Sequence, residues 1–141
     1  MTRKIATFGT ALFLTTTLCA CEAAQKGYAT SAELVEALAD AGLVYTDTTP
    51  LPQPTGGRFR FDECVAYSSD ELWVEIIRIE DKKIFDLARQ AMGILVIAQA
   101  KVGREFPGKP EAYTRQPFVI IVRQEPQPGH VLALLNQVLP E

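Results

Sequence analysis

The single histidine, His130, and a serine are the residues of this chain that could carry out acyl-transfer chemistry. A catalytic triad would pair His130 with Ser31, Ser68 or Ser69 and a carboxylate. None of these serines lies in the Gly-x-Ser-x-Gly sequence that presents a nucleophile in many hydrolases. Ser68-Ser69 before Asp70-Glu71 is typical of a turn, and His130 is expected in the first turn of a helix, exposed or hydrogen-bonded locally. A small hydrolase that uses carboxylates, or Ser69 with His130, is therefore the alternative and not the main prediction.

Acidic residues occur in doublets that could bind a hard cation such as calcium. The doublets are Asp62-Glu63, Asp70-Glu71 and Glu80-Asp81. None has the ligand spacing of a calcium-binding loop, so solvated turns are the simpler interpretation. A zinc site needs three or four ligands, which a chain with one histidine supplies poorly. Gly56-Gly57 lacks the Lys-Ser/Thr of a phosphate-binding loop. The sequence therefore predicts no metal and no cofactor.

The start of the chain has the layout of an export signal. Arg3-Lys4 form a basic start, and an apolar stretch with several Phe and Leu residues runs from Ile5 to Leu18. This stretch is too short to span a bilayer core of about 30 Å. Small residues follow it, as they do before the cleavage site of a secretory signal. The pattern predicts a signal peptide over residues 1–20.

Leu18-Cys19-Ala20-Cys21 resembles the lipobox of bacterial lipoproteins, in which an aliphatic residue, a tolerant position and a small residue precede an invariant cysteine. The resemblance implies that the Cys21 thiol receives diacylglycerol and that the signal is removed just before Cys21. Residues 21–29 would then form a tether. Two acyl chains are enough for stable anchoring, at about 0.8 kcal/mol per buried CH₂. Cleavage by an ordinary signal peptidase, giving a soluble secreted protein, is the alternative.

The same resemblance implies a location in the cell envelope. The protein would be anchored on the outer side of the cytoplasmic membrane or on the outer membrane, facing the periplasm. In lipoproteins of bacteria with two membranes, an acidic residue after the cysteine can favour the inner membrane. Glu22 occupies this position, but Glu is a weaker signal than Asp, so the choice of membrane stays open.

The composition is acidic, with a formal net charge of −3 over 141 residues. Loss of Arg3 and Lys4 with the signal would make the charge more negative. This argues against nucleic acid and against electrostatic docking on anionic lipid. With Cys21 lipidated, an internal disulfide is excluded, so Cys64 is expected to be a small buried apolar residue; a reactive thiol or an intermolecular bridge are the alternatives. Residues 30–141 fit a single domain.

Three helices are predicted from capping signals and helical spacing. Thr30 and Glu33 match a capping box, and Gly42 suits the end of the helix that follows. Glu80-Asp81 provide an acidic start for a second amphipathic segment. Pro128 is tolerated in a first turn. The predicted helices cover residues 31–41, 81–92 and the chain from Pro128 onward.

About four strands are predicted. Arg58 to Phe61 alternate at a period of two, and the strand either ends at Asp62-Glu63 or continues through Cys64 to Tyr67. Leu72 to Ile79 are apolar on both faces, which indicates a central strand. Phe118 to Val122 give the clearest strand. The run Ile94 to Ala98 fits either a short buried strand or a continued helix, and we favour the strand.

The remaining segments are predicted to be loops. Pro50, Pro52 and Pro54 favour a polyproline-like surface loop over residues 45–57. A polar loop is expected over residues 101–116. If the domain binds a partner, exposed aromatic side chains and this proline arm are candidate contacts. The aromatic candidates are Tyr45, Tyr67 and Tyr113.

These elements follow the order α-β-β-α-β-β-α. Helices on one face of an antiparallel sheet satisfy that order most simply. The predicted fold class is α+β: a two-layer sandwich with an antiparallel sheet of about four strands and three helices packed on it.

The segment from Gly108 to Leu135 resembles a group of small bacterial lipoproteins whose globular domain has no settled function. The shared features are Gly108, Pro110 and Tyr113 before an apolar strand and a C-terminal helix. The apolar strand, acidic turn and helix over residues 73–92 fit the same group. The resemblance implies a lipid-anchored envelope protein and assigns no catalytic residue. The main prediction is a non-catalytic binding or structural module that contacts the membrane through Cys21 and has another envelope protein as a possible partner.

Overall fold

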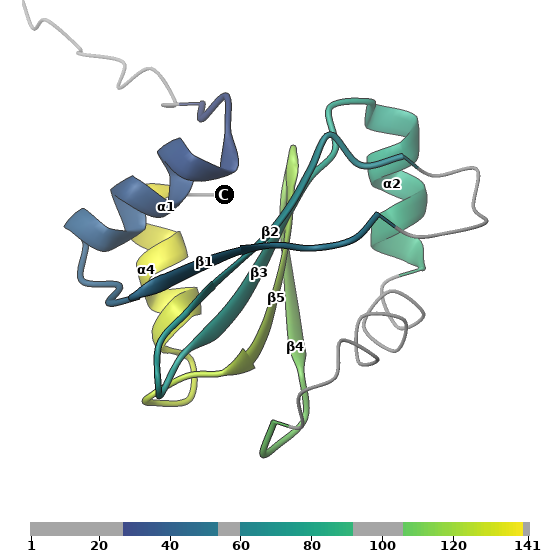
Figure 1. Ribbon diagram of the computed structural model, residues 1–141. Helices are drawn as coiled ribbons and strands as arrows, with labels where there is room; N and C mark the ends of the chain where they lie inside the picture. Colours follow the sequence, from purple (N-terminus) through teal and green to yellow (C-terminus); the bar gives the residue numbers. More distant parts are fainter. Residues whose placement is uncertain (1–26, 54–59, 92–105, 140–141) are drawn as a thin grey trace, which may run out of the picture.

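The computed structural model describes residues 27–53, 60–91 and 106–139, and an antiparallel five-stranded sheet runs through the middle of them (Figure 1). Each strand pairs with its neighbours in antiparallel register. In the order of the sheet, the strands are β1 (Asp47–Pro50), β2 (Glu63–Ser68), β3 (Trp73–Arg78), β5 (Phe118–Gln124) and β4 (Glu111–Arg115).

The described helices are α1 (Ser31–Asp40), α2 (Lys82–Gln90) and α4 (His130–Val138). Together with the sheet they confirm the α+β class, although the sheet has five strands instead of about four. Within the described ranges, no helix is both long and apolar enough to cross a membrane.

The helices cover both faces of the sheet, not one face as expected. Figure 1 shows α1 and α4 on one side and α2 on the other. Val74 and Ile76 of β3 pack in the cluster that includes α1 and α4. Ile77 packs in a second cluster with Phe85 of α2. The physical reason lies in the central strands, which are apolar on both faces and therefore need cover on both.

The predicted capping signals position the first two helices. The Glu33 N–H donates to Thr30 Oγ1 over 3.1 Å, and the Glu33 carboxylate accepts from the Ala29 N–H over 2.8 Å. At the other end of α1, Gly42 has a φ of 121°, which an L-residue rarely adopts. Asp81 caps α2 by accepting from the N–H groups of Lys83 and Ile84.

The last helix begins two residues later than expected, because Gly129 takes a left-handed conformation with a φ of 78° and precedes the helix. Pro128 therefore lies before α4 and not in its first turn. The Glu125 carboxylate accepts from the N–H groups of Gly129 and Val131, over 2.8 and 2.9 Å. An anionic side chain thus satisfies the helix N-terminus.

Two strands lie in segments that were expected to be loops. β1 (Asp47–Pro50) falls in the proline-rich segment, and β4 (Glu111–Arg115) falls in the polar segment before β5. Both are edge strands. Pairing with one neighbour stabilises them, and all four residues of β1 are exposed, so no buried apolar pattern marks it in the sequence.

The expected strand at 58–61 is absent at its described residues, Arg60 and Phe61, and β2 begins at Glu63. The Gln53 side chain instead pairs with the backbone of Phe61. Its Nε2 donates to the Phe61 carbonyl over 2.9 Å, and its Oε1 accepts from the Phe61 N–H over 3.1 Å. Arg58, Phe59, Pro54 and the ambiguous run 94–98 lie outside the described residues.

Candidate functional site

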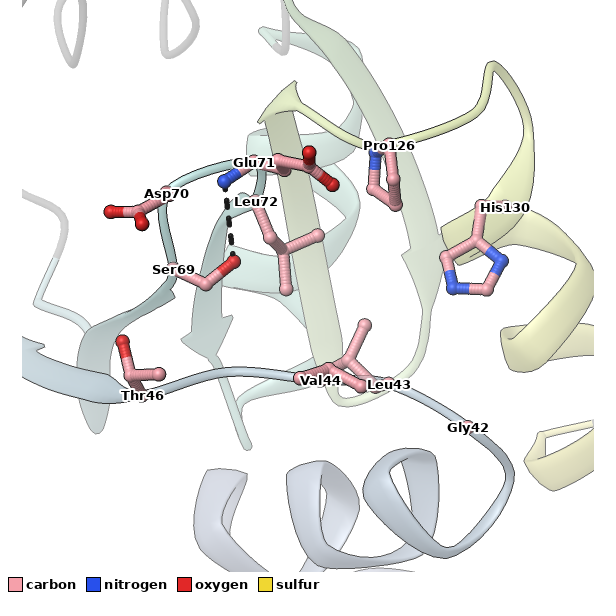
Figure 2. A pocket seen from close by; sticks show the side chains of 10 residues that line it. All are labelled: Gly42, Leu43, Val44, Thr46, Ser69, Asp70, Glu71, Leu72, Pro126 and His130. Atoms are coloured by element: carbon pink, nitrogen blue, oxygen red, sulfur yellow. Dashed lines mark hydrogen bonds between the residues drawn. The ribbon is translucent and has the colours of Figure 1, made fainter.

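A pocket of about 470 Å³ opens at the end of the sheet where three connections meet. These are the loop after α1, the turn between β2 and β3, and the segment between β5 and the start of α4 (Figure 2). The pocket contains apolar side chains, two carboxylates, two hydroxyls and the imidazole of His130. Sequence reasoning did not find it, because its walls come from segments far apart in the chain.

The wall after α1 depends on Gly42. The turn there lets the Leu43 N–H donate to the Leu38 carbonyl over 2.8 Å. This places the Leu43 side chain in the core at 3 % exposure and leaves Val44 74 % exposed beside it. Val44 is therefore an apolar side chain in water at the edge of the pocket.

The opposite wall is the turn between β2 and β3. The Ser69 N–H donates to the Leu72 carbonyl over 2.9 Å, and Ser69 Oγ accepts from the Glu71 N–H over 3.4 Å. Leu72 is buried beneath the pocket. Ser69 thus performs the turn role that its sequence context favours.

Ser69 and His130 line the same pocket but form no catalytic pair. Figure 2 shows the two side chains at opposite sides, with Leu72 between them. In the part of the chain that the structure describes, the His130 ring has no hydrogen bond, and the His130 N–H donates to the Gln127 carbonyl over 3.0 Å. The remaining serines are buried elsewhere: the Ser31 hydroxyl accepts from the Tyr67 hydroxyl over 3.4 Å, and Ser68 belongs to β2.

The pocket is acidic. Asp70 and Glu71 line it, and the described lining residues include no lysine or arginine. Neither carboxylate belongs to an ion pair with a described residue. In Figure 2 the Glu71 carboxylate points across the pocket toward Pro126, whereas Asp70 points away from it. The pocket therefore carries uncompensated negative charge.

The aromatic candidates are less exposed than expected. Tyr67 is buried at 4 % exposure, which contradicts the prediction of an exposed contact. The half-buried ring of Tyr45 packs edge-on against it, with centroids 5.3 Å apart. Tyr113 is also half-buried, and its hydroxyl donates to Glu111 over 2.5 Å. Burial and that hydrogen bond raise the pKa of Tyr113. All three tyrosine rings therefore pack in or against the hydrophobic cluster that includes α1 and α4.

Two acidic doublets make specific hydrogen bonds, and Asp62, Glu80 and Asp81 are exposed to solvent, as predicted. Asp62 accepts from the Glu80 N–H over 2.7 Å, and Asp81 caps α2. Glu63 accepts from the Ser31 N–H over 2.7 Å and from Arg78 Nε over 3.1 Å. Across the described ranges, no group of three or more His, Cys, Asp or Glu residues could hold a metal ion. Cys64 is buried, as predicted.

A buried ion pair on the opposite face was missed by sequence reasoning. Glu75 of β3 is fully buried, and its Oε1 accepts from Arg123 Nε over 2.6 Å and from Trp73 Nε1 over 3.1 Å. Trp73 pairs with Gln124 and Val74 with Val122, so Arg123 is the extra residue of a β-bulge. The available signal was a charged residue inside an otherwise apolar strand, at Glu75.

Cys21, the predicted lipid attachment site, lies outside the described residues. Comparisons of this chain with protein-family models, with curated proteins and with solved structures find no match.

Proposed function

We propose that this chain is a lipid-anchored protein of the bacterial cell envelope, held to the membrane by acyl chains on Cys21. The support is the order of the N-terminal residues: a basic start, a short apolar run, and Leu18-Cys19-Ala20 directly before Cys21.

We propose further that the globular part is a non-catalytic binding module, with the pocket between α1, the β2–β3 turn and α4 as its binding face. The observation that carries this proposal is the combination of an open pocket with Val44 exposed at its edge. The separation of Ser69 from His130 argues against the hydrolase alternative. Specific labelling of Ser69 by a serine-reactive fluorophosphonate would favour that alternative and contradict the proposal.

The anchor is tested by replacing Cys21 with alanine in the native host. Cys21→Ala is expected to abolish labelling by a palmitate analogue and to block lipoprotein processing of the signal, because no other residue of the mature chain fits a lipobox. Cys64→Ala is the matched control and should label like the wild type. Labelling that survives in Cys21→Ala would refute the anchor.

The binding face is tested by photo-crosslinking from single positions in intact cells. A photoreactive residue at Val44 should give a discrete crosslinked product. The same residue at Leu87, an exposed apolar position on α2, should give none. Equal products from both positions, or none from Val44, would contradict a binding function at this pocket.

A further inference from the structure

The pocket has an apolar part that is incompletely covered. Among the described residues, Val44 and Leu87 are the exposed large apolar side chains, and Val44 is the more exposed of the two. Next to it lie Leu43 and Leu72, each only 3 % exposed, and Pro126. An apolar side chain that docks here would remove the surface of Val44 from water, which is favourable.

The pocket also contains polar side chains whose capacity for ion pairs and hydrogen bonds is not fully satisfied by the described residues. Glu71 has no ion-pair partner among the described residues, although its backbone N–H is bonded to Ser69. Many other carboxylates of the fold are engaged: those of Glu33, Glu63, Glu75, Asp81, Asp86 and Glu125. The imidazole of His130 offers a further hydrogen-bonding group on the facing side.

We propose that this pocket docks a peptide segment of an envelope protein that presents a lysine or arginine side chain next to an apolar one. The proposal rests on the binding function proposed above. The cationic group pairs with Glu71, and the apolar side chain packs on Val44 and Leu72. Charge complementarity selects this occupant: the Glu71 carboxylate points across the pocket and the described lining residues include no lysine or arginine, so phosphate groups of lipids or nucleic acids are repelled.

The chain contains one histidine, so the imidazole resonance of His130 reports on the pocket without ambiguity. We would titrate the purified full chain in detergent with the blocked peptide acetyl-Ala-Leu-Lys-Leu-Ala-amide and follow that resonance by NMR. The lysine peptide is expected to shift it saturably. Two control peptides carry glutamate or norleucine in place of lysine and should bind about two- to fivefold more weakly, as expected for the loss of one exposed ion pair.

The matched variants are Glu71→Gln in the pocket and Glu36→Gln on the exposed face of α1. Glu71→Gln should weaken the binding of the lysine peptide by about two- to fivefold, whereas Glu36→Gln should leave its affinity unchanged. A glutamate peptide that binds as tightly as the lysine peptide, an unchanged affinity in Glu71→Gln, or no shift of His130 with any peptide would each overturn the proposal. If crosslinking from Val44 succeeds in those cases, the binding function stands and only this ligand class fails.

Discussion

At the scale of single residues, Glu63 links two elements that are distant in sequence. Its carboxylate accepts from the Ser31 N–H at the start of α1 and from Arg78 of β3. Burial raises the pKa of Glu63, but the hydrogen bonds from Ser31 and the Arg78 guanidinium outweigh it, so the pKa lies below the ordinary value of 4.5. The ionised form therefore stabilises the fold.

The effect of pH follows from this shift. A carboxyl group with a lowered folded-state pKa adds stability above its unfolded-state pKa and loses it as the pH falls through its folded-state pKa. We expect Glu63→Gln to lower the free energy of unfolding by about 1–2 kcal/mol at pH 7. The difference from the wild type should shrink below pH 4.5.

Urea denaturation at several pH values measures this difference, and the exposed Glu36→Gln on α1 is the control. A loss in Glu63→Gln that is as large at pH 3 as at pH 7 would show that the carboxylate charge does not carry the effect. The substitution would then act through packing alone.

A residue-level prediction from sequence succeeds when the partner is close in the chain. The Thr30 cap, which accepts from the Glu33 N–H, and the turn at Gly42 that follows α1 were predicted, because both depend on residues within one or two helical turns. The ion pair between Glu75 and Arg123 joins residues that are 48 positions apart. Capping and periodicity signals extend over only a few residues, so they cannot predict such a pair.

At the scale of elements, central strands were predictable and edge strands were not. β3 and β5 carry dense apolar runs, because both of their faces are buried. β1 and β4 contain mostly polar residues, and only pairing with β2 and β5 makes them strands. In β1, Pro50 also lacks the N–H that an incoming strand would need, which protects this edge from further pairing.

The assignment of helices to faces shows the same distinction. The apolar spacing of each helix showed that it buries one face, but not against which side of the sheet. That side is decided by β3, whose alternate residues Ile76 and Ile77 enter different clusters. A strand that is apolar on both faces must be covered on both faces. The arrangement predicted from the sequence placed all three helices on one face of the sheet and left the other face uncovered.

At the scale of the whole molecule, the two clusters share the sheet and should unfold together. Leu38 of α1 packs in one cluster, and Trp73, the single tryptophan, packs in the other. Leu38→Ala should lower the free energy of unfolding by about 2–5 kcal/mol. The urea midpoint reported by Trp73 fluorescence should fall by as much as the midpoint reported by circular dichroism.

This comparison tests the prediction of a single domain over residues 30–141. Leu87→Ala on the exposed side of α2 is the control and should change both midpoints little. If Leu38→Ala lowers the circular dichroism midpoint and leaves the Trp73 midpoint unchanged, the two faces unfold as separate units.

The placement of the pocket is also a property of the whole molecule. Residues 27–30 precede the first turn of α1, and the pocket begins just after the helix ends, at Gly42. The ten residues of α1 span about 15 Å. Under the proposed anchor at Cys21, the chain would enter the described domain at the end of α1 that is opposite to the proposed binding face.

The sequence alone determined the features that depend on neighbours in the chain: the N-terminal caps of α1 and α2, the apolar central strands, the burial of Cys64 and the α+β class. The tertiary structure decided the features that depend on distant segments. These are the two edge strands, the cover on both faces of the sheet, the Glu75–Arg123 pair and the pocket shared by Val44, Glu71 and His130. The physical reason is range: capping and periodicity act within a few residues, whereas pairing and packing join groups that only the fold brings into contact.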